Sequence, residues 1–318
     1  MENSSRLKFF PVSFFAITMG LGGFSIAVQR AEKMFGLAAG AGALLAWLAG
    51  GVLLFFLATY GSKAFSYSDE LKKDLRHPIK LSFFPAISIS ILLLSIAFFA
   101  HNEQLSFALL AVGAPLQLLF TLFIVSSWIR HPHFEIHHLN PSWFLPVVGN
   151  IVVPIAAVEH GFTEIAWFYF SIGLVFWLVL LTIIFNRIIF HNPLPEKLVP
   201  TFFILIAPPA LVFIAYVKLT GGIDSFARVM YYFALFIVLL LIALSRQFYG
   251  IKFYLSWWAY SFPIAAVSIA SMLMYSKTSA LFFLGASYLF LSAITLIILA
   301  LTILTLRSIL RDEICVEE

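Results

Sequence analysis

Charged side chains are scarce in this sequence: Asp, Glu, Lys and Arg make up only 11% of its 318 residues. Soluble domains carry about 25% charged residues, and this chain has too few to cover a globular surface in water. Apolar residues account for 62%, and the mean hydropathy is +1.01. These values exclude a soluble protein and indicate that lipid surrounds much of the chain. The net charge of +4 is therefore no sign of nucleic-acid binding.

Cysteine pairs and catalytic motifs are missing as well. Cys315 is the single cysteine, which excludes an intrachain disulfide and a paired-cysteine redox motif. The Gly-x-Ser-x-Gly and His-Glu-x-x-His signatures are absent, so the sequence predicts neither an enzyme nor a bound cofactor. Histidine-rich tracts can bind metal ions. We interpret the one tract here as a solvated cytoplasmic turn and predict no metal site; it contains His131, His133, His137 and His138.

The sequence does contain ten apolar runs, each long enough to cross roughly 30 Å of hydrocarbon as a helix. Because the runs are continuous and not alternating, they favour helices over a barrel. The predicted fold is all-α, with spans at 9–28, 36–60, 81–100, 105–128, 142–158, 166–185, 199–217, 229–245, 253–275 and 280–306. The connecting segments are too short to fold alone, so we expect one transmembrane domain over residues 1–318. The first run lacks a signal-peptide cleavage pattern and is expected to be retained.

Basic residues are unevenly distributed between the two sides of this ten-span chain. One side holds 5 of the 19 Lys and Arg residues, which leaves 14 for the side of both termini (19 − 5 = 14). Cytoplasmic loops carry an excess of Lys and Arg, so both termini are predicted to be cytoplasmic. The five residues on the opposite side are Arg30, Lys33, Lys218, Arg228 and Lys277.

Helix-perturbing residues gather in the odd-numbered spans. Proline bends a helix and frees backbone carbonyls, which are tolerated at membrane depth where they face protein or water. The alternation predicts five helical hairpins whose bent members surround a central pore. The alternative is that prolines are simply common in membrane helices. The kinks and lining of the pore are expected at Gly20, Pro85, Pro146, Gly149, Asn150, Pro208 and Pro263.

No predicted span contains any of the 34 formally charged residues, and the histidines also lie outside the spans. Coupled transporters and pumps usually place an acidic or basic side chain within the membrane. The absence of such a group favours passive, weakly selective permeation through an uncharged pore.

Four short motifs in consecutive odd spans resemble the TehA family of tellurite-resistance and dicarboxylate transporters, which includes the plant guard-cell slow anion channels. The first motif reads HPIKLSFFP over residues 77–85, and the second reads NPS at 140–142 followed by VVGN at 147–150. The third is APPA at 207–210, and the fourth is WAYSFP at 258–263. The resemblance extends over essentially the whole chain, which is similar to a bacterial TehA.

The resemblance implies ten helices in five hairpins and three subunits that each own a pore. It also implies that Phe262 blocks the pore, whereas among 36 phenylalanines an ordinary packed ring would be the simpler interpretation. Near Pro11, Ser13 and Ala16 stand where the family tends to have glycines, so helix packing or pore width is expected to differ there. The long kinase-modified tails of the plant members have no counterpart, and regulation through them is not expected here.

The sequence thus predicts a phenylalanine-gated anion channel in a bacterial inner membrane. It would form a homotrimer in the bilayer and pass chloride, nitrate and, by resemblance, tellurite. A carrier for tellurite or malate-like C4-dicarboxylates is the main alternative, and a non-conducting membrane scaffold is the third.

Overall fold

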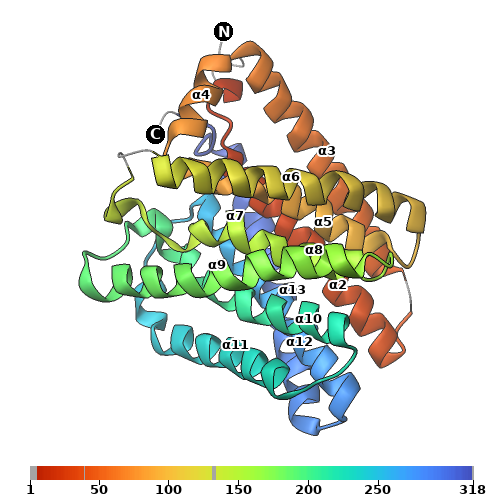
Figure 1. Ribbon diagram of the computed structural model, residues 1–318. Helices are drawn as coiled ribbons and strands as arrows, with labels where there is room; N and C mark the ends of the chain where they lie inside the picture. Colours follow the sequence, from red (N-terminus) through yellow and green to blue (C-terminus); the bar gives the residue numbers. More distant parts are fainter. Residues whose placement is uncertain (1–5, 39, 131–133, 317–318) are drawn as a thin grey trace.

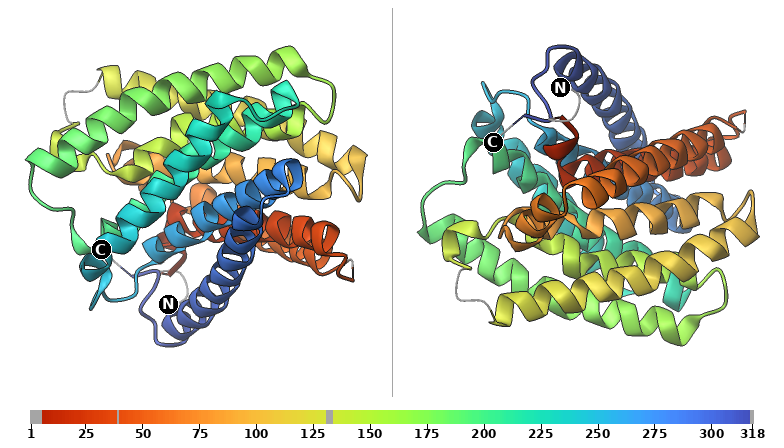
Figure 2. Two further views of the ribbon diagram at one scale, coloured as in Figure 1. Left: turned by 90° about the horizontal axis from the view of Figure 1, so that it is seen from below. Right: turned by 90° about the horizontal axis from the view of Figure 1, so that it is seen from above.

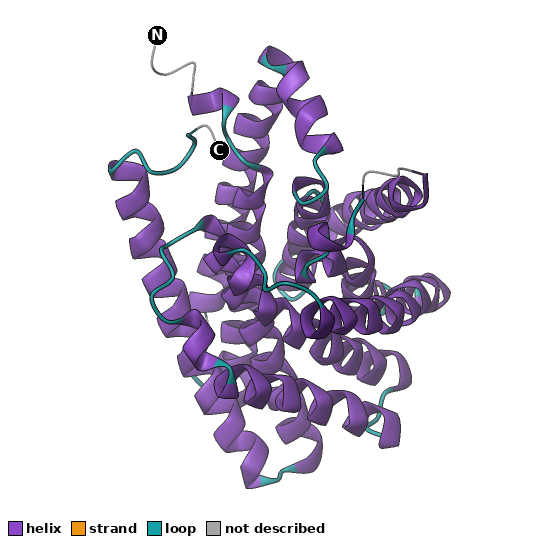
Figure 3. Cartoon of the chain, turned by 90° about the vertical axis from the view of Figure 1, so that its left-hand side faces the viewer, coloured by secondary structure: helices purple, strands orange, loops and turns teal. Residues whose placement is uncertain are grey.

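The computed structural model describes residues 6–38, 40–130 and 134–316, and this part of the chain consists of helices joined by loops, without a strand (Figures 1 and 3). The long helices are α2 (Phe15–Phe35), α3 (Ala41–Ser66), α5 (Pro85–Phe98), α6 (Glu103–Arg130), α9 (Thr163–Phe190), α10 (Ala207–Thr220), α11 (Ser225–Ala243), α12 (Ser261–Thr278) and α13 (Leu281–Leu310). The short α-helices are α4 (Ser68–Arg76), α7 (Phe144–Val148) and α8 (Val152–Ala157).

Short 3-10 segments lead into most of the helices in the odd-numbered predicted spans. They are η1 (Val12–Phe14), η2 (Lys80–Phe83), η4 (Pro141–Trp143), η6 (Glu196–Ile206) and η8 (Leu255–Tyr260). Three others are η3 (Ile136–His138), η5 (Gly149–Ile151) and η7 (Ser245–Phe248). Within the described ranges, nine helices are long and apolar enough to cross a membrane, and the chain is a multi-pass membrane protein. The predicted span at 142–158 corresponds to a shorter apolar run, Pro141–Ala157, which is not one continuous α-helix.

Burial alternates along the chain. Four segments are mostly buried: in an apolar stretch of 18 residues within each of them, between 78% and 89% of the residues are buried. These segments are Val12–Phe35, Lys80–Phe98, Glu196–Thr220 and Leu255–Thr278. The residues of the broken run Pro141–Ala157 are all buried. In α3, α6, α9, α11 and α13 the corresponding share is only 28–33%. We call the first five the inner segments and the last five the outer helices; the outer helices expose large apolar side chains, as lipid contact requires.

The inner segments pack in a closed ring. Helix α2 contacts α5, α5 contacts α8, α8 contacts α10, α10 contacts α12, and α12 returns to α2. Each inner segment also packs along the outer helix that follows it in the sequence. In both views of Figure 2 the outer helices α9 and α13 lie along opposite sides of the molecule.

The broken inner segment is stabilised by polar side chains of its outer neighbour. Pro146 cannot continue a regular ladder of backbone hydrogen bonds. Its carbonyl accepts hydrogen bonds from Gln117 Nε2 (2.9 Å) and Thr121 Oγ1 (2.6 Å), both on α6. Asn150 Nδ2 donates to Thr121 Oγ1 at 2.8 Å and to the Val147 carbonyl at 2.9 Å. Backbone groups released by the bend are thus satisfied inside the protein, which lipid could not do.

The described ends of the chain meet at one end of the molecule, beside α4 (Figure 1). An ion pair between Arg6 and Asp312 joins them directly. Four of the inner segments begin at this end. Their first turns line the same pocket as α4 and the C-terminal residues. We call the opposite end of the molecule, where the inner segments finish, the far end.

Candidate pore and vestibule

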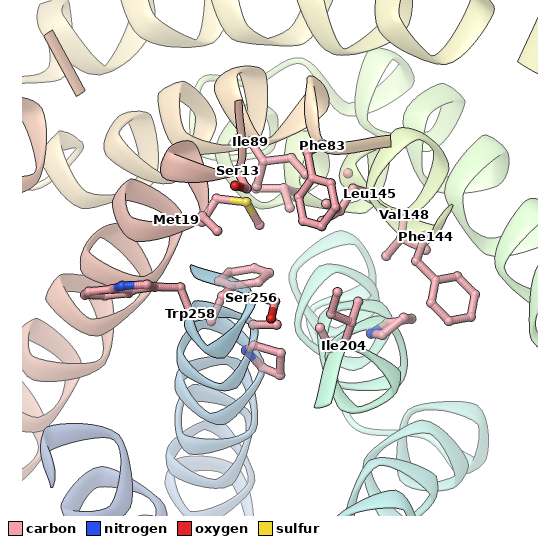
Figure 4. Close-up of a pocket in the computed structure, with 18 of the residues that line it drawn as sticks. Ser13, Met19, Phe83, Ile89, Phe144, Leu145, Val148, Ile204, Ser256 and Trp258 are labelled. Atoms are coloured by element: carbon pink, nitrogen blue, oxygen red, sulfur yellow. The ribbon is translucent and has the colours of Figure 1, made fainter. Parts of the chain in front are cut away.

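A narrow cavity of about 40 Å³ lies at the centre of the ring, and we call it the bore. All five inner segments line the bore, and nearly all of the side chains that they contribute are apolar. Figure 4 shows Met19 of α2 and Phe83 of η2 converging on this space, with Ser256 of η8 beside them. The lining consists of Ser13, Ala16, Met19, Phe83, Ile89, Phe144, Leu145, Val148, Gly149, Val152, Ile204, Ala207, Pro208, Leu211, Leu255, Ser256, Trp258, Ala259, Phe262 and Pro263.

Phe262 occupies the first turn of α12 and lines the bore. Its side chain is 8% exposed, and its ring lies close to the backbone of Gly23 on α2. Pro263 follows where the 3-10 turns of η8 pass into α12, and it has no N–H to donate to the preceding turn.

Four of the eight residues predicted for the pore line the bore: Phe262, Pro263, Gly149 and Pro208. The other four, Gly20, Pro85, Pro146 and Asn150, are not among the lining residues.

The four residues outside the lining have other contacts. A Cβ atom on Gly20 would stand 2.2 Å from Ser261 Oγ, so Gly20 permits close packing of α2 on α12. Pro85 begins α5 and its carbonyl accepts a hydrogen bond from Ser88 Oγ. Pro146 and Asn150 belong to the hydrogen-bonded contact with α6 described above.

Sequence reasoning did not select several of the lining side chains. Met19, Phe83, Phe144 and Trp258 contribute much of the wall, yet they look like ordinary apolar residues in apolar spans. Phe83 and Trp258 do fall inside the motifs HPIKLSFFP and WAYSFP, which was the one available signal. Trp258 is held in place by a hydrogen bond of 2.9 Å from its Nε1 to Thr305 Oγ1 on α13.

Ser13 and Ala16, which stand where the TehA family tends to have glycines, both line the bore. Their side chains occupy space that a glycine would leave open. Ser13 and Ser256 supply the two hydroxyl groups of the lining, and both residues also border a wider pocket next to the bore.

This wider pocket, the vestibule, has a volume of about 350 Å³ and lies at the end of the molecule where the termini meet. It shares Ser13, Phe83, Leu255 and Ser256 with the bore, so the two spaces adjoin each other. In contrast to the bore it is strongly polar. Its charged residues are Lys8, Lys63, Lys80, Lys197, Glu70, Asp74 and Glu313, with His77 beside them.

A buried ion pair forms part of the vestibule wall. Lys63 Nζ lies 2.6 Å from Asp74 Oδ2 and donates a hydrogen bond of 2.9 Å to the Phe10 carbonyl. Both charged side chains are less than 10% exposed. Tyr60 Oη donates to the same carboxylate at 3.2 Å, and Lys80 Nζ approaches it to 3.4 Å. The cluster ties α3, α4 and the turn before α5 to the N-terminal segment.

The position of Lys63 shows that the predicted span 36–60 is too short. The predicted span ended at residue 60, but α3 continues to Ser66 and includes Lys63. Charged residues were used as span ends, and a lysine that is neutralised inside the protein does not end a helix. At the rim of the vestibule the hydrogen bond from Lys73 lowers the pKa of Glu70, which stays ionised there.

Metal-binding side chains do not cluster in the described part of the chain: it holds no group of three or more His, Cys, Asp or Glu that could bind an ion. His137 Nδ1 lies 3.2 Å from Glu135 Oε2, and both side chains are exposed. His131 and His133 lie outside the described residues.

Residues 9–306 match the family described as voltage-dependent anion channel, SLAC1. This match covers nearly the whole chain, which includes the bore, its lining motifs and all of the inner segments. The chain belongs to the SLAC1/TehA family of anion channels and transporters. The members named by these comparisons are channels and transporters, not enzymes.

Individual relatives come from plants and bacteria. The chain is 30% identical to the S-type anion channel SLAH2 of Arabidopsis thaliana over 83% of its own length and 52% of that protein. It is 30% identical to the guard cell S-type anion channel SLAC1 of the same plant, over 72% of its own length and 42% of that protein. The chain thus spans about half the length of these plant relatives. The tellurite resistance protein TehA homolog of Haemophilus influenzae is 24% identical over 83% of the chain and 81% of that protein.

Proposed function

We propose that this protein is a passive anion channel whose conduction path is the bore. The observation that carries the proposal is that five inner segments, distributed over the whole sequence, converge on one apolar cavity next to a vestibule lined by four lysines and three carboxylates. The proposed pathway has ten spans in five hairpins around this axis, and Phe262 is its gate. Residues 1–318 form a single channel domain in this proposal.

The vestibule accounts for a preference for anions. Four lysines and three carboxylates line it, and four inner segments begin there. The amino ends of helices carry partial positive charge, which favours anions by roughly 0.3–1 kcal/mol per helix end. Lysine side chains at the rim add to this field and raise the local anion concentration.

The apolar walls determine which anions pass most readily. A bore with two hydroxyl groups returns little of the hydration energy that an ion gives up on entering it. Weakly hydrated anions such as nitrate should therefore permeate more readily than chloride. Tellurite is a candidate substrate through the printed name of the Haemophilus influenzae relative alone.

We further propose a homotrimer in a bacterial inner membrane with both termini in the cytoplasm. The distribution of basic residues supports this orientation, since 14 of the 19 fall on the side of the termini. The vestibule then faces the cytoplasm, and the far end faces outward.

Current recordings from the purified protein in planar bilayers test the function. Unitary currents whose reversal potential follows the anion gradient, with nitrate more permeant than chloride, are the expected result. Saturating flux with counterflow and no unitary currents would favour a carrier for tellurite or C4-dicarboxylates. The absence of any flux, including from Phe262→Ala, would favour a non-conducting scaffold.

A further inference from the structure

The far end of the ring carries a charged cluster that the bore and the vestibule do not include. It consists of Arg30 near the end of α2, Lys218 in the last turn of α10, and Glu159 just after α8. Lys218 Nζ forms an ion pair with Glu159 and donates a hydrogen bond of 3.1 Å to the Ile155 carbonyl. Arg30 interacts electrostatically with both Glu159 and Lys218.

Helical register places the two basic residues on the axis of the ring. Arg30 follows the bore-lining Met19 by 11 residues, a rotation of about 20° from the same face at 3.6 residues per turn. Lys218 follows the bore-lining Leu211 by seven residues, again within about 20°. Both side chains therefore continue the pore-facing stripe of their helices by two or three turns.

The acidic residue obeys the same register. Glu159 follows the bore-lining Val152 by seven residues, and Val158 between α8 and Glu159 keeps a right-handed helical backbone. In the ring, α2 does not stand next to α8 or α10, because α5 and α12 lie between them. The Coulomb interaction of Arg30 with Glu159 and Lys218 therefore acts across the axis.

Helix capping explains only part of this cluster. Basic residues in a last turn offset the negative partial charge of a helix carboxyl end. Lys277 of α12 has this role, because its Nζ donates to the Gly221 carbonyl at 3.1 Å. Lys218 serves α8 in the same way through Ile155. Within the described part of the chain, however, the Arg30 guanidinium has no hydrogen-bond partner, although it has five donors.

The cluster holds two positive charges against one carboxylate. The nearby His160 is engaged elsewhere, with its Nε2 2.9 Å from Ser106 Oγ. Lys218 is 15% exposed and Glu159 40% exposed, so a small ion can reach the cluster from the far end. A guanidinium whose N–H donors have no protein partner binds halides and oxyanions well.

We propose that Arg30 and Lys218, beside the carboxylate of Glu159, form an anion-binding site at the far end of the conduction axis. The ligand is a small inorganic anion, for which nitrate is the probe. The site deepens the proposed channel function and rests on it for its role in conduction. The site concentrates anions at the far end of the pore. That end has neither the lysines of the vestibule nor the amino ends of the inner segments that begin there.

Sided titrations in the Phe262→Ala background test the role in conduction at low ionic strength. Arg30→Gln should raise the half-saturating nitrate concentration applied at the far end by about tenfold. Glu159→Gln should lower it, and Arg30→Lys should stay close to the parent. Arg228→Gln is the matched control, because Arg228 is exposed on the outer helix α11 at the same end. It should leave the value unchanged, and an equal shift in Arg30→Gln and Arg228→Gln would overturn the proposal.

Equilibrium binding separates the site from the channel function. Nitrate should raise the Tm of the detergent-solubilised wild-type protein and of Arg228→Gln, but not that of Arg30→Gln. If Phe262→Ala conducts no anions while this Tm shift is present, the channel function fails and the site remains. If currents are present but the Arg30→Gln protein keeps the full Tm shift and titration curve, the site is wrong and the channel function remains.

Discussion

A Cβ atom placed on Gly23 would stand 3.0 Å from Cδ2 of the Phe262 ring, so the proposed gate lies against bare helix backbone. The same Cβ would stand 3.2 Å from Ala265 Cβ. Glycine at this position lets α12 approach α2 closely enough for the ring to lie beside the helix. The position of the ring therefore depends on one hydrogen atom in place of a methyl group.

Gly23→Ala should displace the ring of Phe262, because 3.0 Å is shorter than ordinary carbon contact. We expect the displaced ring to enter the bore more deeply and to lower the open probability severalfold. Single-channel recordings measure this effect. Gly22→Ala is the control, because its methyl group would meet Leu93 of α5 at 3.2 Å and not Phe262. In a Phe262→Ala background Gly23→Ala should have no effect on conductance, and a persisting effect would assign it to helix packing.

Phe262→Ala should raise the basal anion conductance sharply, with Phe262→Leu intermediate, because a hydrophobic plug closes a pore by dewetting. Loss of a buried core phenylalanine typically costs about 3–5 kcal/mol of stability. Truncating a side chain that faces a cavity should cost much less stability. Conductance and Tm are therefore to be measured on the same variant. An unstable Phe262→Ala protein with unchanged current would identify Phe262 as a packing residue.

Gln117→Leu should destabilise the protein by about 1–2 kcal/mol, because it removes two buried hydrogen bonds that join α6 to the inner segments. The side chain accepts from Ser88 Oγ at 2.7 Å and donates to the Pro146 carbonyl at 2.9 Å. Thermal unfolding in detergent is the measurement. Thr59→Val is the control, since the exposed Thr59 hydroxyl bonds only within its own helix at the Phe55 carbonyl. Equal Tm values for the two variants would show that the contact with α6 is not needed to hold the broken segment.

Lys63→Met should cost about 3–5 kcal/mol, because it leaves the buried Asp74 carboxylate without its main partner. The double variant Lys63→Met, Asp74→Leu should recover part of this loss. Lys72→Met is the matched control, since Lys72 and Asp69 form an exposed pair worth about 0–1 kcal/mol. Denaturant or thermal unfolding compares the three proteins. A double variant less stable than Lys63→Met would show that Asp74 is stabilised by other partners.

Cys315 should react slowly with a membrane-impermeant thiol reagent at pH 7, because burial raises the pKa of its thiol. The thiolate is the reactive form, so below the pKa the rate should rise about tenfold for each pH unit. In vesicles of known orientation the reagent should reach Cys315 only from the cytoplasmic side. Gln104→Cys in a Cys315→Ser background is the control, because Gln104 is exposed at the start of α6. Labelling of both positions from one side would contradict the proposed orientation.

Much of the helical fold could be predicted from the sequence, because continuous apolar runs specify spans directly. The position of Asn150 could not. The motif VVGN placed Asn150 among the expected kink and lining residues of the pore, yet its amide donates to Thr121 on the outer helix. Both the bore and the lipid require apolar side chains. Hydropathy therefore does not show which face of a helix lines the bore and which face meets lipid. Met19 illustrates the same difficulty, since only packing reveals that it lines the bore.

The inner segments pass through the ring in one direction, from the vestibule toward the far end, and their backbone dipoles therefore add. Side-chain charges at the two ends can be removed by mutation, but the peptide dipoles cannot. A conducting pore built this way has a built-in polarity. Its current–voltage curve should bend differently for the two directions of anion flow even with identical solutions on both sides, so rectification would be a property of the backbone itself.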